Sequence, residues 1–257
     1  MSSPAVRYLG HEIAVYRRLW RSSLASSFLA PILFLAAIGG TLGKSIDHHG
    51  VGHFGGVTYL TWLAPGLLAA NAMQIGVNES TYPVLGGFKW TRHFIAASAT
   101  PLRPEDVVEG WLAWVFLRAS LVSAVFVAVA GAFGALHSPL VLLAIPAGGL
   151  TGLAFAAPMT AWSATRQGDD SFASIQRFGV LPLFLFSGAF FPLTQLPAAV
   201  RPVAYALPLW HGVALCRALA LGRAGLAASL GHAAVLAAYG LAGAIASVIA
   251  FRRRLAA

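Results

Sequence analysis

Long apolar runs separated by short polar stretches recur along the whole chain. An apolar run of about 20 residues is long enough to cross the ~30 Å hydrocarbon core of a bilayer as a helix. Lipid offers the backbone no hydrogen-bond partners, so such runs must be helical unless protein or a watery cavity covers them. The pattern therefore predicts an all-α integral membrane protein with one domain over residues 1–257. We expect six transmembrane helices, at residues 24–43, 59–78, 110–135, 140–162, 178–191 and 227–251.

Ahead of the first predicted span, residues 5–21 carry apolar side chains at helical spacing, with basic side chains mostly off that face. The apolar positions are Val6, Leu9, Ile13, Tyr16 and Trp20. This pattern predicts an amphipathic helix that lies in the membrane interface. The alternative is a terminal helix that packs on a partner in water. Aromatic and arginine residues so close to a span favour the membrane surface.

The stretch from 192 to 221 is apolar, but prolines and charged groups interrupt it. Proline removes a helical hydrogen bond, and a charge inside hydrocarbon is costly. We therefore expect an outer re-entrant pair of short helices between spans five and six, rather than another full span. The residues that mark this region are Phe191, Pro192, Pro197, Pro208 and His211.

Composition and charge agree with a membrane protein and indicate its orientation. Hydrophobic residues make up 58% of the chain and charged residues 10%. The formal charge of +9 comes from basic residues at the ends of apolar runs rather than from one patch, which argues against a nucleic-acid partner. Counting lysine and arginine in alternate loops places both termini in the cytoplasm. The excess of arginine over lysine and the abundant alanine suggest a bacterial plasma membrane protein.

Motifs for chemistry within this chain are weak. A phosphate-binding loop ending at Gly43 and Lys44 would need glycine where Ile38 stands. The histidines of residues 48–53 have one carboxylate nearby and no cysteine, so a solvated outer loop is a better reading than a metal site. The single cysteine, Cys216, excludes an internal disulfide. No catalytic constellation can be assembled, and we expect a non-enzymatic subunit without metal or cofactor of its own.

A charged residue and a set of glycines within the predicted spans can each be interpreted in two ways. Arg118 lies inside the third span, where it either snorkels to the interface or pairs with Glu79 or Glu109 to lock an inner gate. Small residues at helical spacing let helices approach closely, either within one bundle or at a dimer face. These residues are Gly148, Gly149, Gly152, Gly240 and Gly243.

The order of elements, together with several short motifs, resembles the ABC type-2 permeases. The resemblance covers nearly the whole chain and is strongest to nodulation-type (NodJ-like) lipo-oligosaccharide exporters and related drug-exporter permeases. Its motifs are Ala70-Asn71-Ala72-Met73-Gln74, Glu79-Ser80-Thr81, Ala99-Thr100-Pro101-Leu102, Leu185-Phe186-Ser187-Gly188, Phe190-Phe191-Pro192 and Leu207-Pro208-Leu209.

The resemblance implies a homodimer, or a dimer with a similar permease, docked on two ATP-binding cassette subunits that hold ATP and Mg²⁺. It also implies a coupling helix at residues 87–98. Independently of the family, aromatic side chains there could anchor in a partner's groove while basic ones meet acidic groups. A simple surface loop is the alternative. The expected interface residues are Phe88, Lys89, Trp90, Arg92, His93 and Phe94.

The resulting hypothesis is the permease subunit of an ATP-driven exporter for an amphiphilic cargo such as a lipid, glycolipid, lipo-oligosaccharide or hydrophobic drug. An ion-coupled secondary transporter would be expected to show inverted repeats and intramembrane acidic residues for ion coupling, and we find neither. A membrane assembly factor or intramembrane enzyme is the other alternative, and the enzyme would need the catalytic groups that the sequence lacks.

Overall fold

A computed structural model describes residues 3–37, 54, 56–136 and 138–256, with backbone alone for residues 19–31 and 34. The described residues form helices joined by turns, and none of them lies in a β-strand. The long helices are α1 (Pro4–Ala37), α3 (Tyr59–Ser80), α6 (Pro104–Ala132), α7 (Ala144–Ala164) and α12 (Leu226–Leu255). The shorter elements are α4 (Tyr82–Lys89), α5 (His93–Ser98), η3 (Pro139–Leu143), α8 (Phe172–Ile175), η4 (Gln176–Val180), α9 (Leu181–Phe186), η5 (Leu193–Gln195), α10 (Arg201–Ala206) and α11 (Pro208–Ala220).

Four segments are long and apolar enough to cross a membrane, which makes this a multi-pass membrane protein. They are Tyr59–Lys89, Pro104–Ala132, Pro139–Ala164 and Leu226–Leu255. They correspond to the predicted spans two, three, four and six, although α6 begins six residues earlier than expected. Proline suits the first turn of a helix, and the Asp106 carboxylate accepts the N–H of Arg103 at 2.9 Å, so α6 starts at Pro104.

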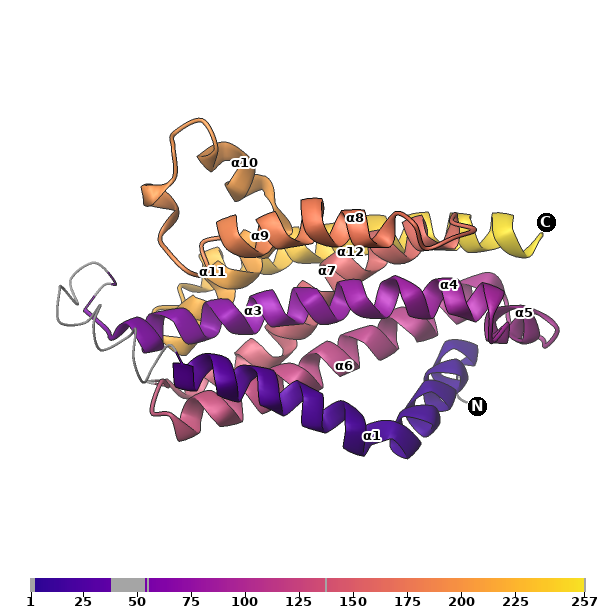
Figure 1. The fold of residues 1–257 in the computed structure, drawn as a ribbon, viewed down its shortest axis with the longest axis horizontal. Helices are drawn as coiled ribbons and strands as arrows, with labels where there is room; N and C mark the ends of the chain where they lie inside the picture. Colours follow the sequence, from indigo (N-terminus) through magenta and orange to yellow (C-terminus); the bar gives the residue numbers. More distant parts are fainter. Residues whose placement is uncertain (1–2, 38–53, 55, 137, 257) are drawn as a thin grey trace.

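The predicted interfacial helix and first span form one continuous helix, α1. Figure 1 shows this helix bent, so that its N-terminal part runs at an angle to the remainder. Residues 38–43, the end of the predicted first span, lie outside the described residues, as do the histidines of 48–53 and the Gly43-Lys44 motif.

The fifth apolar helix runs over Phe172–Phe186 and not over 178–191 as predicted. It begins earlier because the polar run before it closes into α8, and it contains a π-helical turn just ahead of Pro182. Proline cannot donate a backbone hydrogen bond, and such bulges often accompany that loss. The helix ends before Gly188, whose φ of 81° is unfavourable for other residues. Its 15 residues fall short of a full span.

Helix α7 lies at the centre of the bundle, against α3, α6 and α12. A side chain on Gly76 of α3 would collide with the carbonyl group of Gly152, and one on Gly243 of α12 would collide with Pro158. The glycines Gly148, Gly149, Gly152 and Gly243 thus allow close packing of helices within one chain. The region 192–221, where a re-entrant pair of short helices was expected, contains the turn η5 and the short helices α10 and α11.

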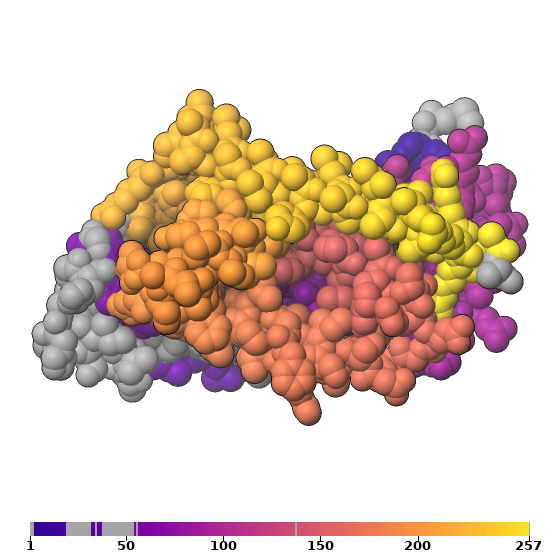
Figure 2. Space-filling model, turned by 90° about the horizontal axis from the view of Figure 1, so that it is seen from above, coloured from indigo at the N-terminus to yellow at the C-terminus, as the bar shows by residue number. Residues whose placement is uncertain are grey.

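The two described ends of the chain lie at the same end of the bundle. In Figure 1 the N-terminus, the C-terminus and α5 are at one end of the bundle, whereas α10 projects near the other end. Figure 2 shows the face on which α12, in yellow, runs along the molecule above the salmon residues that follow α7. The N-terminal part of α1, the turn before α5 and the C-terminal end of α12, which lie at this end, carry Arg7, Arg92 and the arginines of 252–254.

Candidate functional site

The segment between α3 and α6 does not form the single helix predicted for residues 87–98. Helix α4 ends at Lys89, because the N–H groups of Trp90 and Thr91 both donate to the Gly86 carbonyl at 2.9 Å. Arg92 then takes a left-handed conformation with φ of 53°, and α5 follows. This local chemistry produces a helix, a sharp turn and one further short helix. We call residues 87–98 the coupling segment.

Two aromatic residues of the coupling segment belong to the interior of this chain. Phe88 and Phe94 are buried, and both pack on Phe251 near the end of α12, with ring centroids 4.8 and 5.0 Å away. Phe94 also meets Trp111 of α6 edge-on at 5.6 Å. Phe88 and Phe94, expected to anchor in a partner's groove, are thus covered by side chains of their own chain and are only 5% and 0% exposed. They form the base of the segment instead.

The outer surface of the coupling segment is basic and partly apolar. Trp90 is 59% exposed and Ile95 is 47% exposed, and Lys89 and Arg92 are exposed beside them. Lys89 Nζ donates to the Gln167 carbonyl at 3.1 Å, which ties the segment to the loop after α7. An exposed tryptophan flanked by cations is typical of residues that dominate binding energy in protein interfaces.

His93 is half-buried under the coupling segment. Its Nδ1 lies 2.8 Å from the Thr91 hydroxyl, and its ring packs on Phe94 at 4.2 Å. Burial, with a smaller contribution from the charge of His11, lowers the pKa of His93 below its usual value. His93 is therefore a neutral packing residue at pH 7 rather than a cation offered to a partner.

Helices α1, α3 and α6 meet at an ion pair. Arg118 Nη1 lies 2.6 Å from Glu79 Oε1, and the two side chains are 24% and 11% exposed. The Arg118 guanidinium also lies 5.5 Å from the ring centroid of Tyr16, which packs on Trp114 at 5.1 Å. Of the two carboxylates considered for Arg118, Glu79 is the one in contact. Glu109 is exposed on α6, nine residues and thus about 13 Å from Arg118 along the helix axis.

Arg217 of α11 has a structural role that the sequence analysis missed. Its Nε donates to the Trp62 carbonyl at 3.1 Å, and its Nη2 donates to the carbonyls of Gly188 and Ala189 at 3.0 and 3.3 Å. The guanidinium also lies over the Trp62 ring, 3.7 Å from the centroid. Gly66 leaves room for it, because a side chain there would lie 2.8 Å from Nη2. Arg217 thus joins α3, α11 and the turn after α9.

The residues predicted to mark the outer region occupy different parts of it. Pro192 precedes η5 and Pro208 opens α11, both in positions that need no helical N–H. Pro197 is exposed in the turn before α10, and Phe191 packs against a small cluster beneath that turn. His211 Nδ1 lies 2.9 Å from Nδ1 of His232 on α12.

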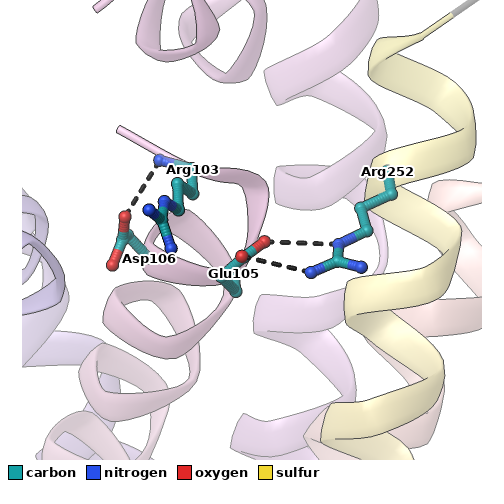
Figure 3. Close-up of polar contacts among 4 residues, drawn as sticks. All are labelled: Arg103, Glu105, Asp106 and Arg252. Carbon is teal, nitrogen blue, oxygen red and sulfur yellow. Dashed lines mark hydrogen bonds and ion pairs between the residues drawn. The ribbon is translucent and has the colours of Figure 1, made fainter. Parts of the chain in front are cut away.

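The C-terminal arginines hold α12 to its neighbours. Figure 3 shows Arg252 facing Glu105 at the start of α6, with guanidinium-to-carboxylate distances of 3.1 and 3.3 Å, beside the Arg103–Asp106 cap. Arg254 Nη1 donates to the carbonyls of Ala164 and Arg166 at 2.7 Å. These carbonyls lie at and just after the C-terminal end of α7, where cations are favoured. Among the described residues no group of three or more potential metal ligands occurs.

Comparison with known proteins places this chain in a family. Residues 9–221 match the ABC-2 type transporter family, so the chain belongs to that family of membrane permeases. It is 34% identical over 250 residues to Nodulation protein J of Rhizobium leguminosarum bv. viciae, covering 95% of this chain and 94% of that protein. It is 36% identical over 217 residues to Nodulation protein J of Rhizobium leguminosarum bv. trifolii, covering 82% and 81%. The Sinorhizobium fredii protein of that name is 32% identical over 250 residues, covering 95% and 93%. The family resemblance noted from the sequence is confirmed.

Proposed function

We propose that this chain is the permease subunit of an ATP-driven exporter that moves an amphiphilic cargo outward across a bacterial plasma membrane. The observation that carries the proposal is the coupling segment. It presents Trp90, Ile95 and two cations on a base fixed by Phe88 and Phe94, at the end of the bundle that holds both termini. A rigid, basic and aromatic surface suits docking of a separate energy-supplying subunit.

In this proposal two ATP-binding cassette subunits hold ATP and Mg²⁺, and a second permease copy completes the pathway. Membership of the ABC-2 family supports this division of labour. The permease contributes no catalytic group. Closure of the ATPase subunits pushes the coupling segments, and the permease dimer rocks so that the cargo moves along the dimer interface. The cargo class, a lipid, glycolipid, lipo-oligosaccharide or hydrophobic drug, is supported by the apolar character of the spans.

The Arg118–Glu79 pair is proposed as the inner gate of this pathway. It links α3, which leads into the coupling segment, to α6, which leads out of it. Of the ion pairs among the described residues, this one joins α3 to α6, so a displacement of the coupling segment would act on it. The helices α10 and α11 are proposed as the outer re-entrant region, with Arg217 holding the turn after α9 in place.

The docking proposal is tested by purifying the complex with Trp90→Ala. Phe133→Ala is the matched control, because Phe133 is another exposed aromatic residue, 41% exposed, outside the coupling segment. We expect Trp90→Ala to weaken ATPase binding about tenfold or more, as truncation of an interface hot spot does. The permease itself should fold normally. If Trp90→Ala and Phe133→Ala retain the ATPase equally, or if wild-type permease copurifies without an ATPase, the docking proposal fails.

A further inference from the structure

A cleft of about 650 Å³ opens between the C-terminal halves of α7 and α12. Its origin is the packing of these two helices. At Gly243 the backbone of α12 touches Pro158, and at Ser247 a hydroxyl donates to the Ala157 carbonyl at 2.8 Å. Past these contacts Pro158 leaves α7 without one backbone donor, and the cleft begins there and extends to the loop after α7.

The lining of the cleft changes from apolar to cationic along its length. Pro158 and Ala161 of α7 face Ala246 and Ile249 of α12 at the apolar end. Trp162 lines the middle of the cleft. Gln167, Arg253 and Arg254 line the polar end, at the end of the bundle where the chain terminates. Such a gradient matches a molecule with a hydrocarbon chain at one end and a polar group at the other.

The charged side chains around the cleft indicate whether the polar group of the bound molecule is anionic or cationic. Among the described residues that line the cleft, arginines are the charged ones. Arg254 is engaged with the carbonyls after α7, so it cancels the negative end of that helix and leaves Arg253 exposed at the mouth. Arg166 adds a third cation, with its guanidinium 4.8 Å from the ring centroid of Trp162. An anionic group at the mouth is therefore stabilised.

We propose that this cleft binds one anionic phospholipid of the leaflet in which the C-terminal end of α12 lies. Its phosphate contacts Arg253, and one acyl chain enters between Ile249 and Pro158. The site requires only that the chain sits in a membrane, and it is independent of the proposed coupling to an ATPase. The lipid fills the cleft beside the direct contact that Arg254 of α12 makes with the end of α7.

Native mass spectrometry of the full-length chain, released from detergent with added lipid, tests this site. The probes are phosphatidylglycerol and phosphatidylcholine with identical acyl chains, and inorganic phosphate alone distinguishes a lipid site from a phosphate site. We expect one retained phosphatidylglycerol, little phosphatidylcholine and no retained phosphate. Arg253→Gln should reduce phosphatidylglycerol occupancy about fivefold. Arg252→Gln is its control, because the neighbouring Arg252 is exposed and does not line the cleft.

A large side chain that fills the apolar end of the cleft provides a second, independent test of the lipid site. Ala246→Trp should abolish retention of phosphatidylglycerol, because Ala246 lines the cleft yet is exposed, so the fold tolerates the larger ring. Ala242→Trp places the same ring one turn away, at an exposed position outside the cleft, and should retain the lipid. Equal binding of both lipids, retention by Ala246→Trp, or equal losses with Arg253→Gln and Arg252→Gln would overturn the proposal.

Discussion

Arg118 and Glu79 place opposite charges where each is mostly shielded from water. Removing one partner leaves the other uncompensated, so Arg118→Glu should lower the free energy of unfolding by about 2–3 kcal/mol and abolish transport. The double variant Arg118→Glu with Glu79→Arg should recover most of both losses, because the pair forms again with reversed polarity. Thermal unfolding in detergent and cargo transport in vesicles measure the two effects.

Glu109→Arg combined with Arg118→Glu is the control for this charge exchange, because Glu109 is exposed and distant from Arg118 along α6. It should not restore stability or transport. Recovery by the Glu109 variant, or no recovery by the Glu79 variant, would contradict the proposed gate.

Arg217 depends on geometry that lysine cannot reproduce. A planar guanidinium donates to three carbonyls and stacks on Trp62, whereas an ammonium group makes fewer directed bonds and does not stack in this way. Arg217→Lys should therefore lower the thermal unfolding temperature and increase hydrogen exchange at residues 187–190. Arg201→Lys is the control, because Arg201 bonds to carbonyls within its own turn, at Thr194 and Leu196. Equal exchange in both variants would contradict the role assigned to Arg217.

The sequence indicated a contact between Arg118 and Glu79. It could not indicate the contacts of Arg217. Within two neighbouring spans, an arginine and a carboxylate can be matched by charge. The partners of Arg217 are backbone carbonyls, one of them 155 residues away at Trp62, and every residue carries such a group. Gly66, four residues after Trp62, is compatible with a neighbouring group packed close to the backbone of α3. The sequence pattern does not identify that group as the Arg217 guanidinium.

At the scale of elements, the fold of the coupling segment depends on Gly87. A Cβ atom there would collide with the Phe94 ring and lie 2.7 Å from His93. Gly87→Ala should therefore cost about 1–3 kcal/mol through overpacking and displace α5 from Phe251. Gly10→Ala is the control, because Gly10 lies in α1 with open space around it and should be unchanged or slightly more stable. Thermal unfolding of both variants provides the measurement, and equal unfolding temperatures would contradict the prediction.

The apolar pattern predicted which helices exist more reliably than it predicted where each helix begins and ends. Spans two, three, four and six appear as long apolar helices near their predicted positions. The fifth helix was misplaced because Phe190 and Phe191 extend the apolar run past the turn at Gly188. Phe88 and Phe94 were assigned to a partner because periodicity within a short loop cannot show that Phe251, far along the chain, already covers them.

At the scale of the whole molecule, the common location of both described termini and α5 predicts the membrane topology. The single cysteine is buried, so an introduced cysteine can be labelled against a low background. A membrane-impermeant maleimide added to intact cells should label Ala198→Cys and should label Ser98→Cys only after permeabilisation. Both positions are exposed in the structure. Labelling of Ser98→Cys in intact cells would reverse the proposed orientation.

The stack of Phe88, Phe94 and Phe251 has a mechanical consequence for the last helix. Dense packing resists compression, so a displacement of the coupling segment would be transmitted through these rings to the final turns of α12. Helix α12 in turn packs closely on α7 at Gly243 and donates a hydrogen bond to it from Ser247. A load applied to the coupling segment would therefore pass through α12 into α7, the helix at the centre of the bundle.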